Sequence, residues 1–316
     1  MSTRQHKWAL DEGYFTEHNH DFHFFFALKK IKELGFDGTV IIDPRKYTLT
    51  LLEIKKGLRD SGLSLMQLHS DYCNMANPDP KERKKAIEWY KKRVEYALEL
   101  EAEQLVIHPG GETMCFETEE EIEEGIERNA ECLKEIIKEA EGTDLKIALE
   151  NTGDIENRPR YLRGILEKVK GTPLEVEIKK KGGMPAEYRF GIRTSHLARV
   201  IEAVKRNSSC DNIGICLDTS HAFATKFGLE DAILEAKKHI ISTHLHDTRS
   251  RIVGEHLLPG TGLIKWDEVM KAFKEIGFSG TFIFEVSLPE SEKRSWNEKV
   301  ELVRKSKKLL EDLLKV

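Results

Sequence analysis

The chain has 316 residues, of which 39% are hydrophobic and 33% are charged, and its net charge is −5 at pH 7. This length suits one large α/β domain with a core of its own. The negative net charge argues against a general nucleic-acid binder, which usually carries a basic excess.

Short apolar runs alternate with longer helical patterns along almost the whole chain. A first strand is expected within His6–Leu10, and seven others follow: Thr39–Asp43, Leu63–His69, Gln104–His108, Lys146–Asn151, Asn212–Asp218, Ile240–His246 and Thr281–Val286. Helical spacing marks the stretches Phe22–Leu34, Leu51–Ser61, Pro80–Leu100, Glu119–Glu141, Thr194–Arg206, Leu229–Lys238, Ile264–Ile276 and Trp296–Leu314. Such alternation gives parallel strands joined by right-handed crossovers. Eight units predict an α/β fold of the (β/α)8 type, a TIM barrel that forms one domain over residues 1–316.

One segment interrupts this alternation, because the fifth and sixth strands are farther apart in the sequence than one βα unit requires. Within residues 154–193, the run LEVEIKKKGGMPAEYRF has two alternating stretches around Lys-Gly-Gly, which predicts a β-hairpin with a Gly-rich turn. An insertion after the fifth strand belongs on the active-site face of a barrel. Its expected role is a lid or specificity loop over the site, and the alternative is a dimer contact or a peripheral addition without a role in the site.

Six consecutive predicted strands end on a side chain that can bind a metal ion. These residues are His69, His108, Glu150, Asp218, His244 and Glu285. Because the carboxyl ends of all strands of a barrel converge on one face, the six side chains are expected to share one pocket. A doubly wound open sheet would not bring them together.

The last four of these residues predict one cation site with three carboxylates and one imidazole. The set Glu150, Asp218, His244 and Glu285 suits Mn²⁺, Co²⁺, Mg²⁺ or Zn²⁺. Such a cation polarises a carbonyl and hydroxyl pair and makes the adjacent C–H acidic, and a neighbouring carboxylate can then move the proton.

The motifs LHSDYCNMA, LVIHPGG, ALENTG, GICLDTSHAF, HLHDT, GEHLLPGTG and FIFEV resemble the xylose isomerase-like TIM-barrel superfamily. That superfamily holds sugar phosphate isomerases, sugar epimerases and the AP endonuclease family 2. The resemblance implies that Glu150, Asp218, His244 and Glu285 hold the common metal, and that Glu150 and Glu285 are also the catalytic acid–base pair. It implies that His221 reaches either the substrate or an additional metal. The resulting hypothesis is a metal-dependent isomerase or epimerase of a sugar, sugar acid or sugar phosphate.

The alternative hypothesis is an apurinic-site phosphodiesterase similar to endonuclease IV, which has a multinuclear zinc site. That resemblance implies a first site from His69 and His108, which share Glu150, and a third site from His221 and His256. Tyr72 falls where that family places a residue that enters the DNA. The third site should also have an Asp two residues before His256, but Gly254 stands there, and the Gly departs from many sugar-active relatives as well.

Three further residues are candidates for substrate binding. His246 follows His244 by one strand period and should point to the same side, where a buried structural histidine is the alternative. Either Arg249 or Arg251 is expected to bind an anionic or hydroxyl group of the substrate, since Arg holds anions in a fixed fork.

The expected cofactor is therefore one divalent ion, with up to three under the endonuclease hypothesis, and the expected partner is a small sugar. Nucleic acid is a partner only under the alternative, and relatives imply a possible homo-oligomer. No stretch approaches 18 apolar residues, and the first residues lack a secretory apolar segment, so no membrane association is expected. The five cysteines form no CxxC pair, which is typical of a reduced, cytoplasmic protein.

Overall fold

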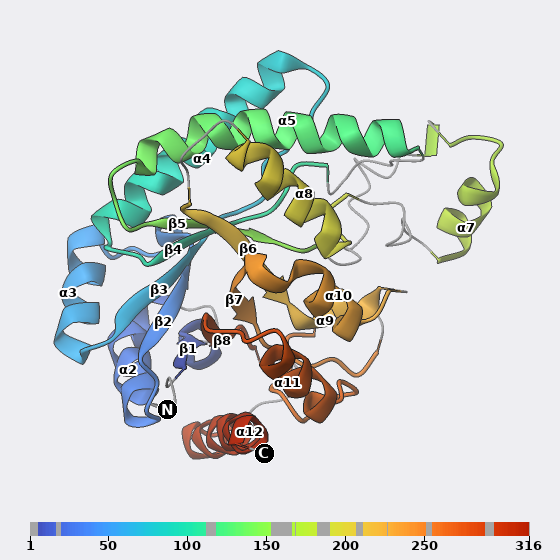
Figure 1. Ribbon diagram of the computed structural model, residues 1–316. Coiled ribbons are helices and arrows are strands. Elements are labelled where there is room, and N and C mark those ends of the chain that lie inside the picture. The colour runs from blue at the N-terminus through green and yellow to red at the C-terminus, as the bar shows by residue number, and fades with distance from the viewer. Residues whose placement is uncertain are drawn as a thin grey trace.

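Eight parallel strands close into a barrel in the computed structural model, with helices on its outside (Figure 1). The structure describes residues 6–16, 20–111, 118–152, 166–167, 169–181, 190–206, 211–225, 227–250, 255–287 and 294–315. Among these residues, no helix is long and apolar enough to cross a membrane.

Each strand pairs with its neighbours in chain order, and β8 pairs with β1 to close the barrel. The strands are β1 Lys7–Asp11, β2 Gly38–Ile42, β3 Ser64–His69, β4 Gln104–Ile107, β5 Lys146–Glu150, β6 Ile213–Asp218, β7 Ile240–His244 and β8 Thr281–Phe284. The predicted (β/α)8 barrel is therefore confirmed, and every predicted strand lies within two residues of an observed one.

The helices follow the strands as the apolar spacing indicated. They are α1 Gly13–Thr16, α2 His20–Glu33, α3 Leu51–Ser61, α4 Pro80–Glu99, α5 Glu119–Ile137, α7 Pro173–Lys181, α8 Thr194–Lys205, α9 Thr219–Ala224, α10 Leu229–Ala236, α11 Trp266–Glu275 and α12 Trp296–Lys315, with short 3-10 turns η1 Pro44–Lys46, η2 Lys138–Ala140 and η4 Lys237–His239. Local signals fix their ends. In α3, Thr50 and Glu53 form a capping box, and Gly62 ends the helix with φ 66°.

The core has two parts, which together determine where the site lies. Side chains on the outer face of the strands pack against the helices in one large cluster, while small and medium residues fill the barrel. The filling residues are Ala9, Val40, Met66, Val106, Ala148, Cys216 and Ile283. Because side chains alternate along a strand, the residue two positions later points inward again, at the carboxyl end of the barrel. In β3, whose pairing with β2 contains a register shift, the inward residue at this end is His69, which follows the buried Gln67 by two positions.

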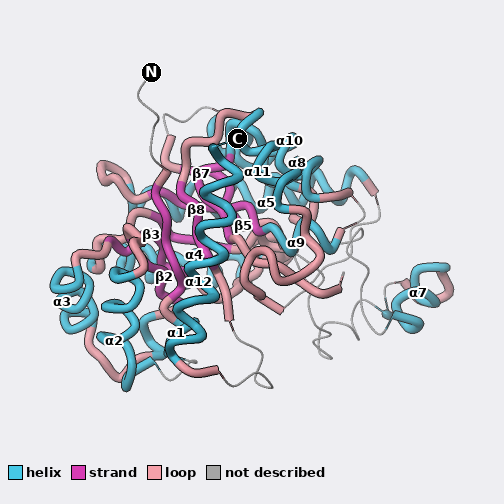
Figure 2. Tube along the Cα trace, turned by 90° about the horizontal axis from the view of Figure 1, so that it is seen from below, coloured by secondary structure: helices cyan, strands magenta, loops and turns pink. Residues whose placement is uncertain are grey.

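The predicted β-hairpin between the fifth and sixth strands is wrong in its first half. The stretch Pro173–Lys181 is helix α7, and Figures 1 and 2 both show it standing away from the barrel. The backbone N–H of Glu175 donates to Thr172 Oγ1 at the helix start, and the Glu175 carboxylate pairs with Lys179 one turn later. These local bonds favour a helix over the alternating pattern of LEVEI. The second half of the predicted hairpin, residues 182–189, lies outside the described residues.

Candidate metal centre

Ionisable side chains occupy the inward position at the carboxyl end of seven of the eight strands. They are Asp11, His69, His108, Glu150, Asp218, His244 and Glu285, and β2 contributes Ile42 at the eighth position. Each follows an interior residue by two positions, as Glu150 follows Ala148 and Glu285 follows Ile283. The six residues predicted from the strand ends therefore meet at one mouth of the barrel.

Glu150 joins two histidines from neighbouring strands. Its Oε2 lies 2.9 Å from Nε2 of His69 and 3.0 Å from Nε2 of His108. His69 donates its Nδ1–H to the carbonyl of Ser70 at 3.1 Å, so its Nε2 faces the carboxylate either with a lone pair or, in the imidazolium, with a second N–H. Two lone pairs at this distance repel unless a proton or a cation lies between them.

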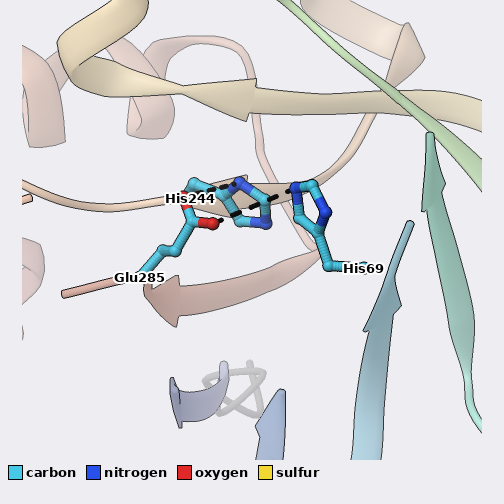
Figure 3. Close-up of side chains that lie close together, drawn as sticks. All are labelled: His69, His244 and Glu285. Atoms are coloured by element: carbon cyan, nitrogen blue, oxygen red, sulfur yellow. Dashed lines mark ion pairs between the residues drawn. The ribbon is translucent and has the colours of Figure 1, made fainter. Parts of the chain in front are cut away.

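The other oxygen of Glu150 faces a second group. His244 Nδ1 lies 3.0 Å from Glu150 Oε1 and 3.2 Å from Glu285 Oε2. Figure 3 shows Glu285 directed toward His244 and His69, whose Nε2 is 4.0 Å from Glu285 Oε1. One ligand atom each from Glu150, Asp218, His244 and Glu285 lies within 4.8 Å of the others. All four residues are buried.

The charges in this centre balance one another. Burial alone would raise the pKa of Glu150, but attraction from His244 and His108 outweighs it and holds that pKa well below its ordinary value. Burial acts on Glu285 in the same way, and His244 again brings the pKa well below the usual range. Burial disfavours protonation of His244, yet Cys216, Glu285 and Glu150 raise its pKa well above normal. The carboxylates are therefore anionic and hold positive charge beside them.

Asp218 is fixed by its neighbours on both sides. It caps helix α9, where its Oδ1 accepts the N–H of His221 at 2.7 Å. The amide of Asn151 accepts the N–H of Asp218 at 2.7 Å and donates to its carbonyl at 3.0 Å. Asp218 Oδ2 is 2.6 Å from Nε2 of His246, which is fully buried. These contacts leave Asp218 little freedom to turn away from the centre.

The histidines assigned to a third site are arranged around His246. The ring of His246 stacks on His256 with centroids 4.3 Å apart and meets His221 edge-on at 6.0 Å. The ligand atoms of His246, His256 and Glu285 lie within 4.8 Å of one another, whereas His221 belongs to no such group among the described residues. His221 instead donates its Nδ1–H to the carbonyl of Asn151 at 2.9 Å. Burial, and then His246, lowers the pKa of His256 to about 4.

The acidic residues near His256 are engaged elsewhere. Asp247 is buried and accepts four N–H groups, and Glu255 accepts from Thr248 Oγ1 at 2.8 Å and from the backbone N–H of Arg249. Neither carboxylate is therefore placed to replace the Asp that is missing at position 254. Arg249 is exposed, and Arg251 and Gly254 lie outside the described residues.

Three residues in or beside the centre were missed by sequence reasoning. Gln67 accepts a hydrogen bond from His244 Nε2 at 2.8 Å, so it fixes the tautomer of that ring. Asn151 orients Asp218, as described above. Asp11 ends β1, and burial, then repulsion from Glu12 and Glu285, raises its pKa well above the ordinary value. Only Asp11 carried a usable signal, because it follows the predicted first strand by one residue.

The donors in this centre fit a divalent cation. Glu285 Oε2 and His246 Nδ1 are buried and have no hydrogen-bond partner among the described residues. Buried polar atoms without partners are rare in folded proteins. Carboxylate oxygens and imidazole nitrogens are the ligands of borderline divalent ions, and the paired lone pairs of His69 and Glu150 also call for a positive charge.

Known proteins share sequence and fold with this chain. The family model described as xylose isomerase-like TIM barrel matches residues 28–306. An uncharacterized protein of Methanocaldococcus jannaschii is 26% identical over 296 residues, which are 92% of this chain and 84% of the relative. A probable endonuclease 4 of Chloroflexus aurantiacus is 27% identical over 172 residues, 54% of this chain, and the match spans only 47% of that relative.

Solved structures share the fold at lower identity. D-psicose 3-epimerase from Clostridium cellulolyticum H10, crystallised with D-tagatose, has a TM-score of 0.68 and 17% identity, covering 98% of this chain and 99% of that one. The IOLI protein, solved with a zinc atom, has a TM-score of 0.70 and 21% identity, covering 98% of both chains. At these identities the likeness shows the fold alone.

Proposed function

The chain belongs to the xylose isomerase-like TIM barrel family, and on that premise we propose that it is a divalent-metal-dependent isomerase or epimerase of a sugar, sugar acid or sugar phosphate. The observation that carries this proposal is the group of Glu150, Asp218, His244 and Glu285, one residue from each of four consecutive strands. A cation bound by these residues would polarise the oxygens of a hydroxy-ketone and make the C–H between them acidic.

Glu150 and Glu285 are the groups proposed to move the proton. They come from β5 and β8, and both approach Nδ1 of His244, at 3.0 Å and 3.2 Å. A substrate carbon held near His244 therefore lies within reach of a carboxylate from either strand. One carboxylate removes the proton, and the other returns it to the same carbon from the opposite face or to the neighbouring carbon. The first outcome is epimerisation and the second is isomerisation.

The remaining predicted residues have supporting roles in this proposal. His221 is held by Asn151 and Asp218, so its Nε2 is available to orient a substrate hydroxyl. His69 and His108 line the other side of Glu150, and His246 supports Asp218. Arg249 is exposed on the loop after β7 and is proposed to meet an anionic group of the substrate. One solved structure of this fold has D-tagatose bound and another has zinc, which supports both the substrate class and the cofactor.

The test is metal-dependent exchange of a carbon-bound proton with solvent. The protein, loaded in turn with Mn²⁺, Co²⁺, Mg²⁺ and Zn²⁺, is incubated in D₂O with a panel of ketoses, their acids and their phosphates. We expect deuterium to enter one substrate, and Glu150→Gln or Glu285→Gln to slow this entry by roughly 10²-fold or more. Glu268→Gln, which changes an exposed residue of α11, is the matched control. Absence of exchange across the panel would contradict the proposal.

The second candidate function is an endonuclease IV-like phosphodiesterase. Its supporting observation is the group of His69, His108 and Glu150, whose ligand atoms lie within 4.8 Å of one another beside the four-residue group. A third zinc site would need His221 and His256 together with an Asp at position 254. His256 instead stacks on His246, which speaks against a third zinc. This candidate requires nicking of abasic DNA and about three zinc ions per chain. If the wild type nicks abasic DNA and His69→Ala does not, the phosphodiesterase function is favoured over the isomerase.

The proposed location is the cytoplasm. Cys73, Cys132 and Cys216 are free among the described residues, and burial raises the pKa of the Cys132 thiol to about 11. Thiols of this kind are inert packing groups that suit a reducing compartment.

A further inference from the structure

The end of β1 carries a carboxyl group that the metal centre does not use. Asp11 follows Ala9 by two positions and pairs with Val40, and both of these residues fill the barrel interior. β1 also pairs with β8, where Leu10 aligns with Phe284. The next aligned position brings Asp11 beside Glu285, on the same inward side.

Asp11 is buried, but half of its carboxyl group has no partner. The residue is 4% exposed, and its Oδ1 accepts the N–H of Gly13 at 2.8 Å. Within the described part of the chain, its Oδ2 forms no hydrogen bond, and no Lys, Arg or His lies within ion-pair distance. Oδ2 is not one of the fully enclosed polar atoms that lack a partner, so solvent or a ligand at the mouth of the barrel can reach it.

Asp11 stands apart from the candidate metal ligands among the described residues. The four groups of ligand atoms that lie within 4.8 Å of one another do not include Asp11, although they include Glu285 next to it. Helix structure does not explain the residue either, because α1 has only four residues and the single bond to Gly13 uses only one oxygen. Asp11 interacts electrostatically with Glu12, Glu285 and His244, and the last two belong to the centre where the proposed substrate reacts.

We propose that Asp11 is a substrate-binding residue whose Oδ2 forms a hydrogen bond with a substrate hydroxyl group, next to the carbon whose proton Glu285 transfers. This inference rests on the proposed isomerase or epimerase function and narrows its substrate class. The substrate must carry a hydroxyl group on the β1 side of the reacting carbon, as polyhydroxylated ketoses do. A substrate that lacks this hydroxyl loses the bond and leaves Asp11 unpaired.

Two variants separate this role from a structural one. Asp11→Asn keeps an oxygen for Gly13 and a polar group for the substrate, whereas Asp11→Ala removes both. The matched control is Asp37→Ala, because Asp37 Oδ2 accepts the backbone N–H of Trp8 at 2.9 Å at the other end of β1, away from the pocket. Zinc affinity by calorimetry, the thermal midpoint, and KM and kcat for D₂O exchange of D-fructose and D-tagatose are measured for all three variants.

We expect Asp11→Ala to raise KM roughly 10- to 100-fold, the usual cost of leaving a buried hydroxyl group without its hydrogen-bond partner, with zinc affinity unchanged within about 3-fold. Asp11→Asn should raise KM less than about 5-fold, and Asp37→Ala should leave KM unchanged while lowering the thermal midpoint as Asp11→Ala does. Should Asp11→Ala not fold, Asp11→Ser takes its place, since its hydroxyl still reaches Gly13 but not the substrate.

Two results would overturn the role of Asp11 while leaving the proposed function in place. One is an unchanged KM in Asp11→Ala with exchange intact, and the other is a loss of zinc affinity in that variant, which would make Asp11 a metal ligand. Absence of exchange in the wild type overturns the proposed function and this inference together, so the two failures are distinguishable.

Discussion

Replacing Asp247 by Asn tests how the loop that carries His256 is held beside the barrel. Asp247 is fully buried, and its two oxygens accept four N–H groups. Oδ1 accepts from Thr248 at 2.9 Å and Ile264 at 3.1 Å, and Oδ2 accepts from Gly260 at 3.0 Å and Trp266 Nε1 at 2.9 Å. An asparagine offers one oxygen, so two of the four donors face an NH₂ group whichever way the amide turns.

The structure sets the size of this effect. Each buried donor left without an acceptor costs about 1–3 kcal/mol, so two of them should lower the free energy of unfolding by about 4 kcal/mol. For a chain of 316 residues the unfolding entropy is roughly 0.7 kcal/mol/K, which makes the expected fall in Tm about 6 °C.

The assay is urea and thermal unfolding followed by tryptophan fluorescence, since the Trp266 indole is itself one of the donors. Asp267→Asn, the same change at an exposed position of α11, is the control and should lie within about 0.5 kcal/mol of the wild type. If Asp247→Asn behaves like this control, the four hydrogen bonds do not hold the loop, and the reasoning is refuted.

Two further predictions concern other parts of the barrel. His196 stacks on Phe190, and burial, then Arg199 and Arg193, lowers its pKa from 6.5 to about 4. Between these pH values His196 is protonated in the unfolded chain but neutral in the folded protein. The free energy of unfolding therefore falls as pH falls from 6.5 to 4, by up to about 3 kcal/mol. His196→Phe should remove this part of the pH dependence in urea titrations at pH 7 and pH 4.5, and an equal loss in both proteins would contradict the assignment. A Cβ at Gly214 of β6 would lie 2.5 Å from Ile241 Cγ2 and 2.8 Å from the carbonyl of His239. Gly214→Ala should therefore lower the free energy of unfolding by about 1–3 kcal/mol. An unfolding midpoint equal to that of the wild type would show that β7 moves to make room for the methyl group.

The barrel could be predicted from the sequence because strand and helix periods differ and because caps mark the helix ends. Thr50 with Glu53 and Asp79 before Pro80 are examples, and both helices begin where these residues indicate. The same rule, applied to Thr172 and Glu175, would have identified α7 in place of a hairpin. The alternating pattern of LEVEI is a weaker signal than a local cap, because the cap stabilises the helix directly.

The residues of the site that end a strand could be predicted from the sequence. The contacts that depend on how neighbouring strands align could not. Glu150, Asp218, His244 and Glu285 meet because each ends its strand, which the sequence displays. The bond from His244 to Gln67 crosses the barrel between β7 and β3, which are not neighbours, and the pairings of these strands with β6 and β2 contain register shifts, at Ile215/Cys216 and Thr39/Val40. No periodicity in the chain reports such shifts.

Metal content, measured together with metal position, tests the central claim most directly. The protein is stripped with chelator, dialysed against Zn²⁺ or Mn²⁺, assayed by elemental analysis, and crystallised for anomalous diffraction. We expect at least one ion per chain, bound by Glu150, Asp218, His244 and Glu285, and loss of that ion in Asp218→Asn. An ion-free protein, or anomalous density away from these four side chains, would contradict the account.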